Sequence, residues 1–195
     1  MALDDPYIHA WTNLHFEPED DTFLMELYGN TTLNSSNGQD TFNEDASFDT
    51  GWDRSILNIP GPFSVVASNA CGTGIISAPH NVIFDENCRE YIMIQPRTWP
   101  EMLQVTEAAV VDVFDSYHDD GNNYWTIQEV KYWWRQKNEI LEILKLPELI
   151  QRNRNQDKRY AYYLENFAES YLTRYCYFLE NGIWPDTKRV KLPDL

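Results

Sequence analysis

The sequence has few basic residues and no long apolar runs. Its 195 residues include 31 acids and only 15 Lys or Arg, which gives a formal net charge of -16. Such a surface repels nucleic acid and anionic membranes, so we expect no direct duplex nucleic-acid binding and favour a basic partner. No stretch approaches the roughly 18 consecutive apolar residues that a membrane-spanning helix needs. A membrane protein is therefore not expected.

Cysteine is scarce as well, and a recognisable secretory signal is missing. Cys71, Cys88 and Cys176 are odd in number and not closely paired, so we predict buried, reduced thiols and no disulfide framework. Residues 1–6 have neither the positive start nor the apolar run of a signal peptide. We therefore expect a chain that is not secreted and lies in the cytoplasm or within a virus particle.

The few basic residues are concentrated in the last third of the chain. Residues 1–130 contain 22 acids and three bases, a net charge of -19, whereas residues 131–195 contain 12 bases and nine acids, a net charge of +3. One interpretation is intramolecular, with the basic part packed on the acidic part. The other is intermolecular, with a basic cluster that binds a neighbouring subunit. That cluster comprises Arg152, Arg154, Lys158 and Arg159.

The first half of the chain is predicted to be β-rich, within a single domain that spans residues 1–195. Short β-branched or aromatic runs separated by turn residues predict a small antiparallel sheet within residues 1–97. These runs lie at residues 11–16, 55–59, 63–67, 74–77, 82–84 and 91–94. Residues 29–51 are rich in Asn, Ser, Thr, Gly and Asp, which predicts a polar arm or loop that is either mobile or ordered by something outside its own domain.

A helical part is predicted from residue 98 to residue 195, where apolar residues recur at helical spacing. Two capping boxes, Thr98 to Glu101 and Thr126 to Glu129, open helices that should end near Asp119 and Pro147. Together with the sheet, these helices predict an α+β fold. The apolar side of the first helix is predicted to comprise Met102, Leu103, Val110, Val113, Phe114 and Tyr117.

A third, long helix is predicted within residues 147–184. Its apolar stripe from Tyr160 to Leu179 should pack against the two preceding helices, and Gly182 fits a left-handed cap at its end. Phe167 is expected in the core and Tyr163 beside it, with tyrosine hydroxyls reaching polar partners at the core edge.

Two groups of residues are candidates for chemistry, although no cofactor is expected. Asp112, Asp115, His118 and Asp119 could hold a hard cation, but they fail the EF-hand spacing, and a solvated helix edge is the more common explanation for such a cluster. The second group is Cys71, His80 and Cys88, as zinc ligands with Cys176 or His118, or as a Cys71 nucleophile with His80 as base. It lacks the closely paired ligands of a structural zinc site.

The function predicted from the sequence is non-enzymatic assembly. Aromatic side chains at Trp133, Trp134 and Tyr163 join the basic cluster as predicted interface residues. The protein would pack with copies of itself or with other subunits, most concretely as a neck, connector or tail component of a phage or other virion. One alternative is an acidic inhibitor, either an immunity protein or a nucleic-acid mimic, which requires carboxylates on one exposed face. A metal- or cysteine-dependent enzyme is the other.

Overall fold

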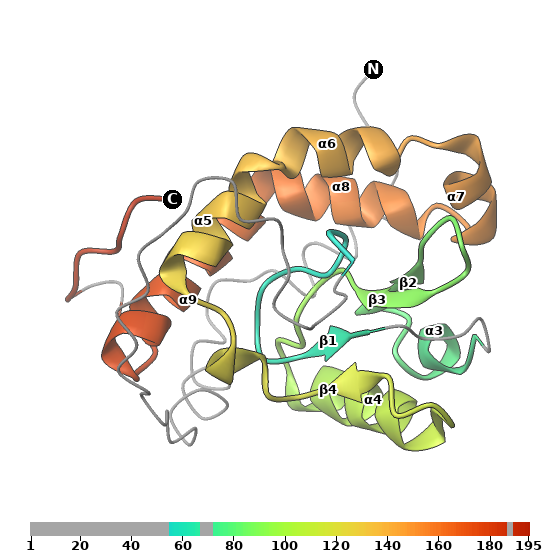
Figure 1. Cartoon of the computed structure of the whole chain (residues 1–195), viewed down its shortest axis with the longest axis horizontal. Coiled ribbons are helices and arrows are strands. Elements are labelled where there is room, and N and C mark those ends of the chain that lie inside the picture. The colour runs from blue at the N-terminus through green and yellow to red at the C-terminus, as the bar shows by residue number, and fades with distance from the viewer. Residues whose placement is uncertain (1–54, 67–71, 187–188) are drawn as a thin grey trace.

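A computed structural model describes residues 55–66, 72–186 and 189–195 of the chain. It has the α+β fold that the sequence predicts (Figure 1). The described elements in chain order are β1 (Ser64–Val65), α3 (Thr73–Ser77), β2 (Val82–Phe84), β3 (Glu90–Ile92), α4 (Trp99–Val111), β4 (Tyr117–His118), the 3-10 turn η1 (Gly121–Asn123), α5 (Ile127–Arg135), α6 (Lys137–Ile143), α7 (Pro147–Arg152), α8 (Gln156–Asn166) and α9 (Ala168–Asn181). The predicted arm at residues 29–51, the predicted strand at residues 11–16 and Cys71 lie outside the described residues.

The described strands form two separate antiparallel pairs. Strand β2 pairs with β3, and β1 pairs with β4, where Val65 lies opposite Tyr117. Strand β4 lies in a segment predicted to be helical, so the prediction that the first helix continues to Asp119 is wrong. The helix ends because Asp112 adopts an extended backbone, and its carboxylate accepts the N–H of Ser116 at 2.6 Å in the turn toward β4.

Two predicted strands have other conformations. Residues 74–77 belong to helix α3, and residues 55–59 form turns that end in a hydrogen bond from the N–H of Ile59 to the carbonyl of Ile92 at 2.9 Å. Short apolar runs do not distinguish a strand from a buried helix or turn by periodicity alone, which explains both errors. The run at residues 82–84 is confirmed as strand β2. The run at residues 91–94 is confirmed only in part, because strand β3 covers Glu90–Ile92 and the chain bends at Met93 and Ile94.

Buried side-chain amides join segments that no backbone ladder connects. The Oδ1 atom of Asn58 accepts the N–H groups of Val65 at 3.2 Å and Ile92 at 2.8 Å, and its Nδ2 donates to the Val65 carbonyl at 2.8 Å. Gln95 similarly accepts from the N–H of Phe63 and donates to its carbonyl. Buried backbone groups require such partners, so these amides link β1 to β3 and fix the preceding loop.

The segment predicted as one long helix consists of α7, α8 and α9. The first break lies at Arg154 and Asn155, which have positive φ angles of 51° and 70°, and the second at Phe167, with φ of -130°. The apolar spacing continues across both breaks, so periodicity did not reveal them. The predicted end is confirmed: Gly182 has φ of 71°, and its N–H donates to the Phe178 carbonyl at 2.7 Å.

Aromatic side chains from the C-terminal helices hold the turns before β1. The hydroxyl of Tyr160 donates to the carbonyl of Leu57 at 3.0 Å, and the indole N–H of Trp133 donates to the carbonyl of Ile56 at 2.8 Å. Helix α9 packs on α8 and on α5, which confirms the predicted contact with the second helix. The predicted packing on the first helix is wrong, because α4 packs mainly on α3 and β4. The expectation that tyrosine hydroxyls reach polar partners at the core is confirmed by Tyr160.

Candidate interaction surface

Helix α4 begins at the cap that the sequence predicts. The Thr98 hydroxyl accepts the N–H of Glu101 at 3.3 Å, and Pro100 lies in the first turn. The Glu101 carboxylate accepts the N–H of Arg97 at 2.7 Å, one residue before the cap. The start of the helix is thus set by local sequence, whereas the orientation of its faces depends on its neighbours.

The face of α4 that is buried differs from the predicted one. Val105 and Ala108 are buried, together with the carboxylate of Glu101, while Leu103 and Val110 are 66% and 78% exposed. Of the six residues predicted on the core side, Met102 and Tyr117 pack partly against the core and the other four are exposed. The helix is apolar on several sides, so periodicity alone could not select the side on which α3 and β4 pack.

The exposed apolar residues of α4 and of the turn that follows it form a surface, which we call the α4 surface. It comprises Trp99, Leu103, Val110, Val113 and Phe114, each more than half exposed. The first three are spaced by four and seven residues and therefore lie on one side of the helix. Five large apolar side chains exposed together on one side of a helix and in the turn after it form a contiguous patch of the kind that marks interaction sites.

Among the described elements, α3 and β4 pack on the other side of α4. Figure 1 places α4 at the edge of the molecule beside β4, away from α5, α6 and α8. The exposed side of α4 lies opposite Val105 and Ala108, which face the packed elements. An apolar helix face in this position is typical of a site for another macromolecule.

The chemistry around the α4 surface is acidic. Residues 98–130 contain seven acids and no Lys or Arg. Of these acids, Glu107, Asp115 and Asp119 are exposed, whereas Glu101 and Asp112 are buried. The apolar surface is therefore accompanied by negative charge from its own segment, which favours a positively charged partner.

The predicted cation ligands do not converge. Asp112 is buried and accepts the N–H of Ser116, Asp115 and Asp119 are exposed, and His118 lies half-buried in β4. Across residues 55–66, 72–186 and 189–195, no group of three or more His, Cys, Asp or Glu side chains could hold a metal ion.

The residues of the predicted zinc or cysteine site have other surroundings where the structure describes them. The Nδ1 atom of His80 lies 2.9 Å from Nη2 of Arg159, and it must accept the hydrogen bond because a guanidinium only donates. Cys88 is half-buried in a turn, with a φ of 62°. Cys176 is buried in α9, and burial raises its pKa to about 11, so this thiol is protonated at neutral pH.

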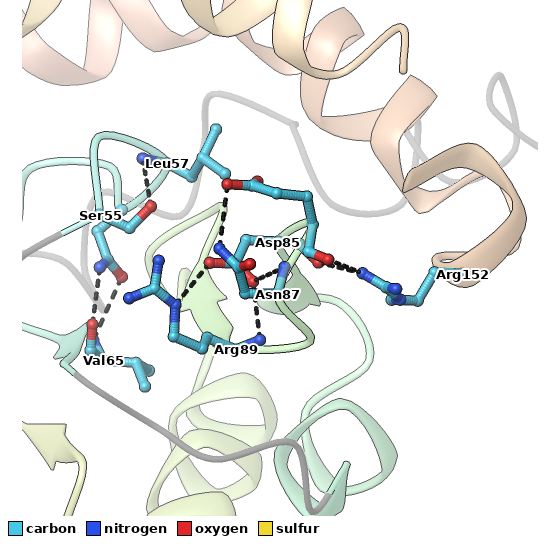
Figure 2. Close-up of polar contacts among 9 residues, drawn as sticks. Ser55, Leu57, Val65, Asp85, Asn87, Arg89 and Arg152 are labelled. Carbon is cyan, nitrogen blue, oxygen red and sulfur yellow. Dashed lines mark hydrogen bonds and ion pairs between the residues drawn. The ribbon is translucent and has the colours of Figure 1, made fainter. Parts of the chain in front are cut away.

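Two members of the predicted basic cluster bind within the chain. Figure 2 shows Arg152 reaching the turn between β2 and β3, where its Nη1 donates to the carbonyls of Asp85 and Glu86 at 2.7 Å each. Arg159 is 4% exposed and bonds to Gln156 as well as to His80. For these two arginines the intramolecular interpretation holds, because their guanidinium groups support the fold.

The other two members remain at the surface. Arg154 is exposed and Lys158 is half-buried. Their proposed contact with a neighbouring subunit stays a prediction.

The aromatic residues predicted at an interface divide in the same way. Trp133 and Tyr163 are each 2% exposed, so neither side chain is available at the surface and their assignment to an interface is corrected. Both are large enough to fill space between helices, which a sequence pattern does not distinguish from partner binding. Trp134 is half-buried, with Nζ of Lys137 lying 4.6 Å from the centre of its ring.

A buried carboxylate that the sequence did not single out links three elements. Glu90 accepts the N–H groups of Gly74 at 2.9 Å and Ile75 at 3.2 Å through Oε1, and the Tyr117 hydroxyl at 2.9 Å through Oε2. Burial raises the pKa of Glu90, these hydrogen bonds oppose the shift, and the charge of Asp112 adds to it. The carboxylate binds N–H groups in the first turn of α3, so its position is explained by structure alone.

We expect Glu90→Gln to remove a pH dependence of stability. The folded state raises the pKa of Glu90 above its ordinary 4.5, so its contribution to stability is present below that pH and is lost as pH rises through the raised value. Gln stays neutral throughout. Urea unfolding should therefore show that the free energy of unfolding of the variant, relative to that of the wild type, rises between about pH 4 and pH 7. The exposed Glu107→Gln serves as control. If the free energies of unfolding of Glu90→Gln and the wild type differed by the same amount at both pH values, the argument would be contradicted.

Comparison with protein-family models, with curated proteins and with solved structures gave no match for this chain. No helix in the part of the chain that the structure describes is long and apolar enough to cross a membrane. The α4 surface was missed in the sequence because four of its five residues, Leu103, Val110, Val113 and Phe114, were assigned to the core. The available signal was an apolar helix within a segment that has seven acids and no Lys or Arg.

Proposed function

We propose that this protein is a non-enzymatic assembly protein, which packs into a larger complex through the α4 surface. The observation that carries the proposal is the exposure of Leu103, Val110, Val113 and Phe114 on and just after one helix. Apolar side chains exposed to this extent are stabilised when another molecule removes them from water, at about 25 cal/mol for each Å². A component of a phage or other virion remains the most concrete version, and it rests on the sequence.

The burial of five carboxylates bears on the acidic-inhibitor alternative, because these five cannot lie on a surface that covers a basic partner. An inhibitor that covers a basic enzyme, or imitates nucleic acid, needs its acids on one exposed surface. Five acids of the described chain are instead buried in the fold: Asp85, Glu90, Glu101, Asp112 and Asp157. Two of them bind backbone N–H groups at turns, Asp85 in the β2–β3 turn and Asp112 after α4. These carboxylates are used to build the fold.

The test is the native mass of the protein in extracts of the cells that produce it. We expect the wild-type chain to migrate in a complex well above its own 23.0 kDa. The double variant Leu103→Ser/Val110→Ser removes apolar area without changing charge, and it should shift the chain toward the mass of the monomer. Leu146→Ser, which alters an apolar residue 37% exposed between α6 and α7, is the matched control. It should leave the complex intact.

Two outcomes would overturn the proposal. The first is a wild-type chain that migrates as a monomer in a gentle extract. The second is a complex that persists unchanged in the double variant, with both variants showing the circular dichroism of the wild type.

A further inference from the structure

We infer that the α4 surface binds an amphipathic helix of a different protein, with an apolar face flanked by Lys or Arg. This inference rests on the proposed assembly function and names the chemistry of the partner. It combines two observations, an apolar stripe on a helix and the absence of Lys and Arg from residues 98–130, which follow Arg97.

The apolar stripe has the geometry of a helix-binding face. Trp99, Leu103 and Val110 follow one line along α4, and Val113 and Phe114 extend the apolar surface past its end. Two helices pack by inserting the side-chain ridges of one into the grooves of the other, at interaxial distances of about 8–10 Å. A standard interface takes about 800 Å² from each partner, of which somewhat more than half is apolar, and the five exposed apolar side chains would supply part of that apolar area.

The charge argues against two other occupants. A second copy docked α4 to α4 would bring the exposed Glu107 and Asp115 against the same two acids, with no Lys or Arg within residues 98–130 of either copy to pair with them. An anionic membrane would be repelled by Glu107, Asp115 and Asp119 in the same way. A helix with basic flanks pairs these carboxylates while its apolar side covers the stripe.

The rest of the described chain offers no matching surface for a head-to-tail contact between copies. Outside residues 76–114, the large apolar side chains with substantial exposure are single residues on separate elements: Tyr124, Tyr132, Leu146 and Ile183. Single exposed apolar residues are normal on any protein. The described residues therefore contain no second apolar stripe of this size.

The experiment uses the purified full chain and two synthetic helical peptides of about 18 residues, long enough to cover the 13 residues of α4. One peptide carries Leu on one face and Lys on the other, and the second replaces every Lys by Glu. Binding is measured by titration calorimetry at low and high salt. We expect the Lys peptide to bind with one-to-one stoichiometry, at least tenfold more tightly than the Glu peptide, and more weakly at high salt.

Three variants test both components of the surface. Leu103→Ser/Val110→Ser should weaken binding of the Lys peptide at least tenfold, whereas Leu146→Ser should leave it unchanged. Glu107→Gln/Asp115→Asn removes two exposed charges, and it should weaken binding and reduce the salt dependence. Asparagine tolerates the left-handed backbone of Asp115, whose φ is 52°, so this variant should fold.

Each other outcome overturns the inference in a defined way. Equal binding of the Lys and Glu peptides removes the role of charge, and binding unaffected by Leu103→Ser/Val110→Ser places the peptide elsewhere. Self-association of the purified chain that this double variant abolishes would identify a second copy as the occupant. A large complex in cell extracts with no peptide binding would reject this partner and leave the assembly function standing, whereas a monomer in extracts rejects the function itself.

Discussion

Asn58→Ala is expected to lower the free energy of unfolding by about 3 kcal/mol or more, because the amide satisfies three buried backbone groups. These are the N–H and carbonyl of Val65 and the N–H of Ile92, in two strands that belong to different sheets. Alanine leaves all three without this partner in a site that is 1% exposed in the wild type. Urea denaturation monitored by circular dichroism measures the change.

The control for this prediction is Asn138→Ala, an exposed position in α6. It should alter stability by less than about 0.5 kcal/mol, as is usual at the surface. If Asn58→Ala lowered the free energy of unfolding no more than Asn138→Ala does, the buried amide would not be the link between β1 and β3.

Tyr163→Ala is expected to destabilise the protein by about 3–5 kcal/mol, and Phe167→Ala by clearly less. The sequence predicts the reverse order, because the apolar stripe was expected to place Phe167 in the core and Tyr163 beside it. The structure buries Tyr163 in α8 to 2% exposure, whereas Phe167 is half-buried at the break between α8 and α9. Truncation at a buried site leaves a cavity, and a half-buried site can partly fill with water.

Thermal and urea unfolding of the two variants decide between these orders. The rings of Tyr163 and Phe167 stack with centroids 6.5 Å apart, so the double variant should cost less than the sum of the single effects. A Tyr163→Ala variant as stable as the wild type would mean that this side chain lies at the surface, as the sequence analysis placed it.

The assignment of faces illustrates why a correct element can still be oriented incorrectly from its sequence. The start of α4 followed from Thr98, Pro100 and Glu101, since a cap depends on side chains within one turn. The buried side of the same helix depends on α3 and β4, which pack on it from other parts of the chain. Leu103 and Val110 are as apolar as Val105, so nothing local distinguishes the core face from the exposed face.

The same reasoning applies to the basic cluster. The sequence showed that Arg152, Arg154, Lys158 and Arg159 lie close together in the chain, and it left an internal and an external role open. Only the tertiary structure brings Arg152 to the β2–β3 turn and Arg159 to His80, because these partners are 66 to 79 residues away in sequence. Charge clustering is a local property, whereas the partner of each charge is a long-range one.

The sequence by itself determined the α+β class, the short strands at residues 82–84 and 91–92, the caps at Thr98, Thr126 and Gly182, and the excess of acid. Each of these depends on spacing or chemistry within a few residues. Only the tertiary structure decided where helices break, which side of α4 is buried, and that Asn58, Glu90 and Tyr163 are interior. Those features depend on contacts between segments that are distant in the sequence, and a local pattern does not show which segments come into contact.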